Sequence, residues 1–148
     1  MAGLVHSIEE LVGRTPLMEL DRFERQQQCG AHLLAKLEFF NPTGSVKDRA
    51  ALSMMAFCRR MMCRKAHFPT ICGQTGAMRA SMSAPRKAYE TAHEVLRAEG
   101  LFLGTSAAAA LHAAVQVGRR PENQGKNIVV IVPDNGMKYL STPMYRQK

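Results

Sequence analysis

Lys47 is the side chain whose place in the sequence most favours chemistry. It follows a Pro- and Gly-containing turn at residues 41–44 and lies in the first turn of a helix predicted to start at Ser45. The positive end of a helix dipole disfavours the charged ammonium form of a lysine, and partial burial would disfavour it further. The neutral amine is the form that attacks an aldehyde, so Lys47 is a candidate for Schiff-base chemistry. An ordinary solvated lysine fits the same position, and both interpretations stay open on residue type and spacing alone.

Ser106 is the second residue of interest, because it stands at the start of another predicted helix. That helix covers residues 106–117, with Ser106 as its N-cap and Gly118 closing it. A hydroxyl at a helix start also points toward any ligand bound there. A purely structural cap and a ligand contact are therefore both compatible with this residue.

The elements that must position these two residues predict an α/β fold, since strands are mixed with helices. Short strands are predicted within residues 15–20 and over residues 32–38, from turn signals and partial alternation. Residues 127–132 form a β-branched run of the kind found in a buried parallel strand.

Two further helices are predicted between the strand at residues 32–38 and the Ser106 helix. The helix that starts at Ser45 should run to about Met62, with an apolar face and with Asp48 completing a capping box. A helix over residues 87–99 should end at Gly100 in the left-handed conformation, followed by Leu101 as its apolar contact.

A resemblance to a known family rests on two blocks of sequence. Residues 8–17 and 35–49 resemble the N-terminal part of the cysteine synthases (O-acetylserine sulfhydrylases), relatives of cystathionine β-synthase. The pattern Asn-Pro-Thr-Gly-Ser-Val-Lys-Asp-Arg at residues 41–49 is its most specific part. The C-terminal region of the same family is similar to residues 99–106, 121–123, 128–134 and 139–142.

The resemblance implies a fold-type II enzyme dependent on pyridoxal 5'-phosphate (PLP), with the three-layer α/β architecture of the tryptophan synthase β family. Lys47 would form the internal aldimine with PLP, and the Ser106 hydroxyl would bind its pyridine nitrogen. The implied reaction is a β-replacement, in which O-acetylserine and sulfide give cysteine and acetate. Family members are commonly homodimers, which is the assembly the resemblance implies.

Several parts of the family pattern are absent from this sequence. Ala108 stands where the family usually has glycine, so its Cβ is expected to crowd the cofactor ring or shift the helix start. Neither a Ser-Gly-Asn-Thr-Gly substrate loop nor a Gly-Thr-Gly-Gly-Thr phosphate loop occurs. We therefore expect a reduced remnant of the fold with a partial sheet, impaired or inactive as an enzyme. The alternative is a non-catalytic remnant or an interaction fragment.

The domain organisation follows from the same comparison. Residues 1–148 form a single truncated domain that is family-like over 5–56 and 87–142, with an atypical insert at about 57–86. The insert is basic and rich in cysteine and methionine, and no Asp or Glu occurs between Arg49 and Tyr89. The net charge of +8 comes from this stretch.

The composition also bounds other classes of function. Clustered basic residues attract nucleic acid, but the stretch lacks interleaved aromatic residues, so nucleic acid is not the favoured partner. Cys58, Cys63, His67 and Cys72 lack the tight Cys-x2-Cys spacing of zinc sites, so no metal is expected. Residues 1–10 contain no apolar run long enough for a signal peptide, and the wholly apolar runs are too short to span a bilayer, so we expect a cytoplasmic protein. The four cysteines of such a protein are expected to be free thiols.

Overall fold

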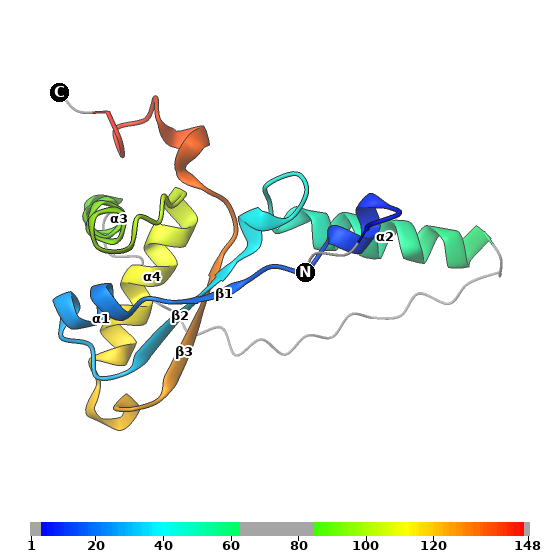
Figure 1. Ribbon diagram of the computed structural model, residues 1–148. Coiled ribbons are helices and arrows are strands. Elements are labelled where there is room, and N and C mark those ends of the chain that lie inside the picture. Colours follow the sequence, from blue (N-terminus) through cyan, green and yellow to red (C-terminus); the bar gives the residue numbers. More distant parts are fainter. Residues whose placement is uncertain (1–3, 63–84, 147–148) are drawn as a thin grey trace.

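The fold was analysed in a computed structural model, which describes residues 4–62 and 85–146 (Figure 1). The helices are α1 (Asp21–Gln27), α2 (Lys47–Met62), α3 (Pro85–Glu99) and α4 (Thr105–Gly118). The strands are β1 (Leu17–Glu19), β2 (His32–Leu37) and β3 (Asn127–Val132). Short 3-10 turns are η1 (Ile8–Leu11), η2 (Glu38–Phe40), η3 (Pro121–Asn123) and η4 (Gly136–Tyr139).

The three strands form one small mixed sheet in the order β1-β2-β3. Strand β1 runs antiparallel to β2, with Met18 opposite Ala35, and β2 runs parallel to β3, with Ala35 opposite Val130. The sheet and its helices confirm the α/β class and the partial sheet expected from the sequence. The positions of all three strands were predicted to within a few residues.

One face of the sheet carries the core. Leu33, Ala35 and Leu37 of β2 alternate with more exposed residues and are buried beside Val130 and Val132 of β3. Helices α1, α3 and α4 lie on this side (Figure 1). The buried residues that they contribute to the core include Phe23, Val95, Ala107, Leu111 and Val115. The apolar residues at alternate positions of the strands therefore pack against the apolar faces of the helices.

The other face of the sheet, which we call the open face, is largely solvent-exposed. Leu17, Val129 and Ile131 are exposed large hydrophobic side chains on this face. The prediction that residues 127–132 form a parallel strand is confirmed, but the prediction that this strand is buried is wrong for alternate residues. A run of apolar residues does not reveal whether both faces of a strand are covered, because coverage depends on distant elements.

The helix termini correct several local predictions. Helix α1 was not predicted, and α2 begins at Lys47 rather than Ser45. The N-cap of α4 is Gly104 and makes no side-chain hydrogen bond, so Ser106 lies inside the helix and is not its cap. The left-handed stop after α3 is confirmed, since Gly100 has a φ of +70° and Leu101 is buried.

Helix α2 extends away from the sheet (Figure 1). Its predicted apolar face is not buried as expected, because Ala50 and Met54 are exposed. Most of the atypical insert, including three of the four candidate zinc ligands, lies outside the described residues, as does the side chain of Cys58. Within the described part of the chain there is no group of residues that could hold a metal ion. None of the helices described is long and apolar enough to cross a membrane.

Candidate functional site

The starts of α2 and α4 meet at the carboxyl end of β3. The backbone N–H of Val46, next to Lys47, donates to the carbonyl of Pro133 at 2.9 Å. The N–H of Gly104, the N-cap of α4, donates to the carbonyl of the adjacent Asp134 at 3.3 Å. Two helix N-termini from distant parts of the sequence are thus tied to consecutive residues. The region beyond the carboxyl ends of parallel strands is where α/β folds bind ligands.

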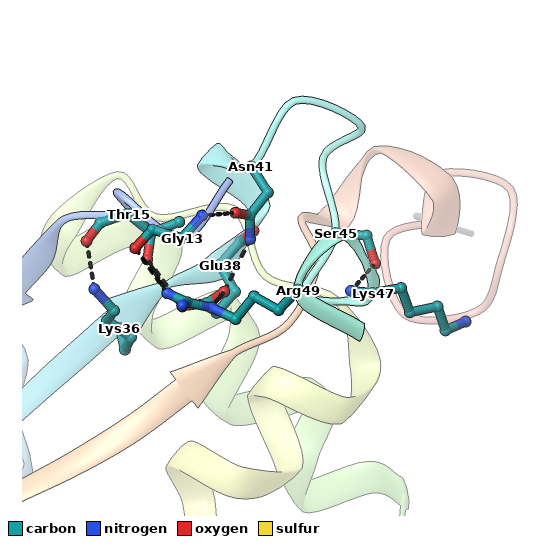
Figure 2. A network of polar contacts seen from close by, with 8 residues as sticks. All are labelled: Gly13, Thr15, Lys36, Glu38, Asn41, Ser45, Lys47 and Arg49. Atoms are coloured by element: carbon teal, nitrogen blue, oxygen red, sulfur yellow. Dashed lines mark hydrogen bonds and ion pairs between the residues drawn. The ribbon is translucent and has the colours of Figure 1, made fainter. Parts of the chain in front are cut away.

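Lys47 is the first residue of α2, and its side chain is exposed. Its backbone N–H donates to the Oγ of Ser45 at 3.3 Å, and its side chain points away from the neighbouring polar residues (Figure 2). The partial burial considered from the sequence is therefore not found. Solvent reaches the amine.

Asp48 fixes the loop that precedes Lys47. Its carboxylate accepts a hydrogen bond from the N–H of Thr43 at 2.8 Å and a second from the Thr43 hydroxyl. Asp48 is 9% exposed, so these bonds are made largely out of water. A capping box would have the Asp48 carboxylate accept from the backbone N–H of Ser45. The carboxylate instead accepts from Thr43, which the turn places beside it.

Arg49 anchors the first turn of α2 to the end of β2 through what we call the Glu38 cluster: Gly13, Thr15, Glu38, Asn41 and Arg49 (Figure 2). The Arg49 guanidinium donates to both carboxylate oxygens of Glu38, at 2.7 and 2.8 Å. The Thr15 hydroxyl and the Asn41 amide also donate to this carboxylate, each at 2.8 Å. Arg49 further donates to the carbonyl of Gly13 at 2.9 Å, and the N–H of Gly13 donates to Asn41 at 2.8 Å. The cluster joins the N-terminal segment, the end of β2 and the start of α2.

The electrostatics of the cluster centre on Glu38, which is 2% exposed. The hydrogen bonds from Arg49 are the largest influence on its pKa, which falls from the ordinary 4.5 to about 2 against the opposing effect of burial. The hydrogen bonds from Thr15 and Asn41 also lower the pKa of Glu38. Glu38 in turn raises the pKa of Arg49 above its usual value. A buried carboxylate is acceptable here because its oxygens are paired and hydrogen-bonded.

Ser106 lies in the first turn of α4 with an exposed side chain. The turn before it needs a glycine, because a Cβ on Gly104 would lie 2.1 Å from Oδ1 of Asp134 and 2.9 Å from the ring of Tyr139. Oδ2 of Asp134 accepts a hydrogen bond from the Tyr139 hydroxyl at 2.9 Å, whereas the buried Oδ1 has no partner. Gly104 thus lets the helix start approach the segment after β3.

Ala108 packs between α4 and α3. It is fully buried in a small cluster with Ala88 and Ala92 of α3 and with Met144. Its Cβ is used in packing α4 against α3, and the expected crowding of the cofactor ring stays a prediction. Small residues at such a contact let two helices approach closely.

Comparison with known proteins places this arrangement in a family. Residues 8–87, which contain Lys47 and the Glu38 cluster, match the family model described as pyridoxal-phosphate dependent enzyme. The chain belongs to this family. Its relationship within the family is to the cysteine synthases, as the sequence indicated.

The curated relatives match over a short part of their own length. Cysteine synthase 1 of Emericella nidulans is 52% identical over 50 residues, which covers 34% of this chain and 13% of that protein. A cysteine synthase of Staphylococcus aureus is 41% identical over 58 residues, covering 39% of this chain and 18% of that protein. The chain thus spans less than a fifth of these relatives in sequence.

Solved structures agree on the fold. The cysteine synthase of Entamoeba histolytica superposes with a TM-score of 0.71 at 17% identity, covering 99% of this chain and 92% of that one. An O-ureido-L-serine synthase superposes with a TM-score of 0.74 at 16% identity, covering 97% and 96% of the two chains. This PLP-enzyme family member therefore shares its α/β fold with cysteine synthases.

The residues present partly fit the family cofactor. The first turns of α2 and α4 offer an exposed amine at Lys47, an exposed hydroxyl at Ser106 and two helix starts suited to an anion. The sequence of the described residues contains no glycine-rich loop that resembles the family's phosphate loop. The Glu38 cluster was not singled out from the sequence. Its signal was a Glu and an Arg flanking the turn, and only the fold shows that the two side chains pair.

Proposed function

We propose that this chain binds PLP through the Lys47 amine and is an impaired relative of the cysteine synthases. The observation that carries the proposal is the convergence of the α2 and α4 starts on Pro133 and Asp134. This convergence brings the lysine-bearing turn and the Ser106-bearing turn to one end of the sheet. A ligand with an aldehyde and a phosphate could use both.

Each residue has a stated task in this proposal. The Lys47 Nζ would hold the cofactor, and the same amine would act as the base for the proton on the substrate α-carbon. The Ser106 hydroxyl would donate a hydrogen bond to the pyridine nitrogen and so tune the chemistry of the ring. The Glu38 cluster and Asp48 hold the turn that carries Lys47. The bound cofactor supplies an electron sink for loss of a substituent from the β-carbon, with O-acetylserine and sulfide as the family substrates.

Impairment follows from the surroundings of Lys47. Its amine is exposed, so water competes at the reacting atoms. No glycine-rich loop is present to donate backbone N–H groups to the cofactor phosphate. We therefore expect weak cofactor affinity and little or no turnover.

Spectroscopy of the protein mixed with PLP tests the attachment. The wild type should develop the visible absorbance of a lysine-linked cofactor, and borohydride reduction should fix the adduct on the peptide that contains Lys47. Lys47→Ala should lose the signal, whereas Lys126→Ala, an exposed lysine outside the proposed site, should keep it. Equal labelling of wild type and Lys47→Ala would contradict a specific site.

Product analysis separates impairment from the second candidate, a non-catalytic fragment. The exposure of Lys47 is the observation that favours this second candidate. The PLP-loaded protein is supplied with O-acetylserine and sulfide, and cysteine is measured against Lys47→Ala. Slow formation of cysteine that depends on Lys47 supports an impaired enzyme. Equal rates of cysteine formation in the two proteins would mean that Lys47 does not catalyse the reaction, which favours the non-catalytic fragment.

A further inference from the structure

A half-open cleft lies between α3 and α4, beside the end of α1. Its volume is about 270 Å³, below the range of clefts that hold drug-sized ligands, so its size suits a small metabolite. His112 in the cleft lies about 10 Å along α4 from the start of that helix. The cleft is therefore separate from the candidate site at the starts of α2 and α4. The residues that line it include Gln27, Lys87, Thr91, Glu94, His112 and Arg119.

The cleft holds a carboxylate and a guanidinium group that an amide keeps apart. The side-chain amide of Gln27 donates to Oε2 of Glu94 at 2.8 Å, and its oxygen accepts from Nη2 of Arg119 at 3.0 Å. Nε of Arg119 also donates to the backbone carbonyl of Gln27 at 2.9 Å. Within the described residues neither Glu94 nor Arg119 forms an ion pair. Oε1 of Glu94 and Nη1 of Arg119 are therefore free to bind a ligand.

The charges that line the cleft balance each other. Lys87 and Arg119 are positive, and Glu90 and Glu94 are negative, although the whole chain has a net charge of +8. Glu90 already bonds to Arg86 at 3.2 Å, so Glu94 is the acid left for a ligand. A simple anion or cation would meet a like charge as well as an opposite one. A free α-amino acid carries an ammonium and a carboxylate on one carbon, so each of its charges meets an opposite charge.

Uncharged polar groups lie beside these charges. The Thr91 hydroxyl, in a residue that is 4% exposed, donates to the carbonyl of Lys87 at 2.9 Å, so its oxygen accepts from Nδ1 of His112 at 3.1 Å. This assigns the ring proton to Nδ1 and leaves Nε2 as an acceptor, to which the Gln116 amide donates at 2.8 Å. These groups suit a ligand side chain that donates and accepts hydrogen bonds without carrying a charge.

We propose that the cleft binds a free α-amino acid with a polar, uncharged side chain. The ammonium of the ligand lies at Glu94 and its carboxylate at Arg119, and its side chain extends toward His112. Ion pairs with solvent-exposed side chains are weak, so we expect a dissociation constant of roughly 1 mM. The cleft is separate from the proposed PLP site, and this inference does not rest on the proposed function.

Isothermal titration calorimetry of the full chain without PLP tests the site, with L-glutamine as the probe at up to about 20 mM. Saturable binding is expected in the wild type and equally in Lys47→Ala, because the cleft lies away from Lys47. A wild type that shows no saturable binding overturns the proposal. That failure would leave PLP attachment at Lys47 unaffected, since the spectroscopic test of attachment uses a different ligand and a different readout.

Two analogues of the probe test the recognition of each charge. N-acetyl-L-glutamine lacks the ammonium group, and L-glutaminamide lacks the carboxylate. Each should bind the wild type at least tenfold more weakly than L-glutamine. Binding of N-acetyl-L-glutamine as tight as that of L-glutamine would show a site for anions, and the same result with L-glutaminamide would show a site for cations. Either result overturns the proposal.

Substitutions in the cleft test its two charged groups. Glu94→Gln removes the charge but can still accept the hydrogen bond from Gln27, and Arg119→Gln removes the guanidinium. Each should weaken binding of L-glutamine at least fivefold. Glu122→Gln and Arg120→Gln are the matched controls, because both residues are exposed and lie outside the cleft. The controls should bind like the wild type. Equal binding by all four variants, or equal weakening in the controls, overturns the proposal.

Amide chemical shifts locate the bound probe. L-glutamine should shift the amide signals of Thr91, His112 and Arg119 in the wild type and leave those of Val46 and Lys47 unchanged. Shifts confined to the residues around Lys47 would place the amino acid at the proposed PLP site instead, which overturns the proposal. This measurement and the analogue titrations use the wild type, so they decide the matter even if a variant fails to fold by far-UV circular dichroism.

Discussion

Replacement of Glu38 by glutamine tests the electrostatic account of the Glu38 cluster most directly. The substitution keeps the shape of the side chain and removes its charge, so the paired guanidinium of Arg49 faces a neutral amide. A pKa of about 2 in the folded protein, against the ordinary 4.5, corresponds to about 3 kcal/mol of stabilisation by the charged form. The side chain of Arg49 is 42% exposed, so solvent screens part of this. We expect Glu38→Gln to lower the free energy of unfolding by about 2 kcal/mol at pH 7.

The pH dependence carries the sign of the effect. A carboxylate whose pKa is depressed by folding stabilises the protein fully above its unfolded pKa, and this stabilisation is lost as the pH falls toward the folded pKa. The difference between wild type and Glu38→Gln should therefore be constant above pH 5.5 or so. It should shrink between about pH 4.5 and pH 2, where protonation of Glu38 makes the two proteins electrostatically alike.

Urea unfolding followed by circular dichroism at a series of pH values measures this difference. Glu122→Gln is the matched control, since Glu122 is 65% exposed and lies 4.0 Å from Arg120. This control should change stability by less than about 0.5 kcal/mol at any pH. A loss for Glu38→Gln that does not vary with pH would refute the assignment of the effect to the Glu38–Arg49 ion pair.

Other substitutions probe the packing and the site. Arg49→Lys keeps the charge but loses the two-pronged contact with Glu38, so we expect a loss of about 1 kcal/mol in urea unfolding. Gly104→Ala should destabilise the fold by about 2 kcal/mol or more and slow any PLP attachment, because its Cβ would overlap Asp134. Leu111→Ala removes a side chain that is 1% exposed and should cost about 2 to 4 kcal/mol in thermal or chemical unfolding. Lys47→Ala should leave stability within about 0.5 kcal/mol, since the side chain is exposed, while abolishing specific PLP labelling.

Predictions from the sequence succeeded where the signal was local. The pattern at residues 41–49 identified the lysine-bearing turn, and the family match over residues 8–87 agrees with it. Gly100 ended α3 as expected, because a left-handed residue after a helix is specified by the glycine itself. The boundaries of α2 and α4 were displaced by one or two residues, since several nearby hydroxyls and glycines can serve as the start of a helix.

Predictions failed where burial decided the outcome. The exposed residues of β3 and the exposure of Ala50 and Met54 on α2 depend on what packs against these elements. The burial of Ala108 also depends on packing, because α3 covers that side of α4.

The sequence by itself determined helices α2, α3 and α4, the strands, the lysine-bearing turn and the family relationship, because each is specified by short-range spacing and residue type. The tertiary structure decided that Val46 and Gly104 bond to adjacent carbonyls, that Arg49 pairs with Glu38, and that β3 is an edge strand among the described residues. These contacts join residues distant in the chain, and their energies depend on desolvation and geometry. Both properties exist only once the chain has folded.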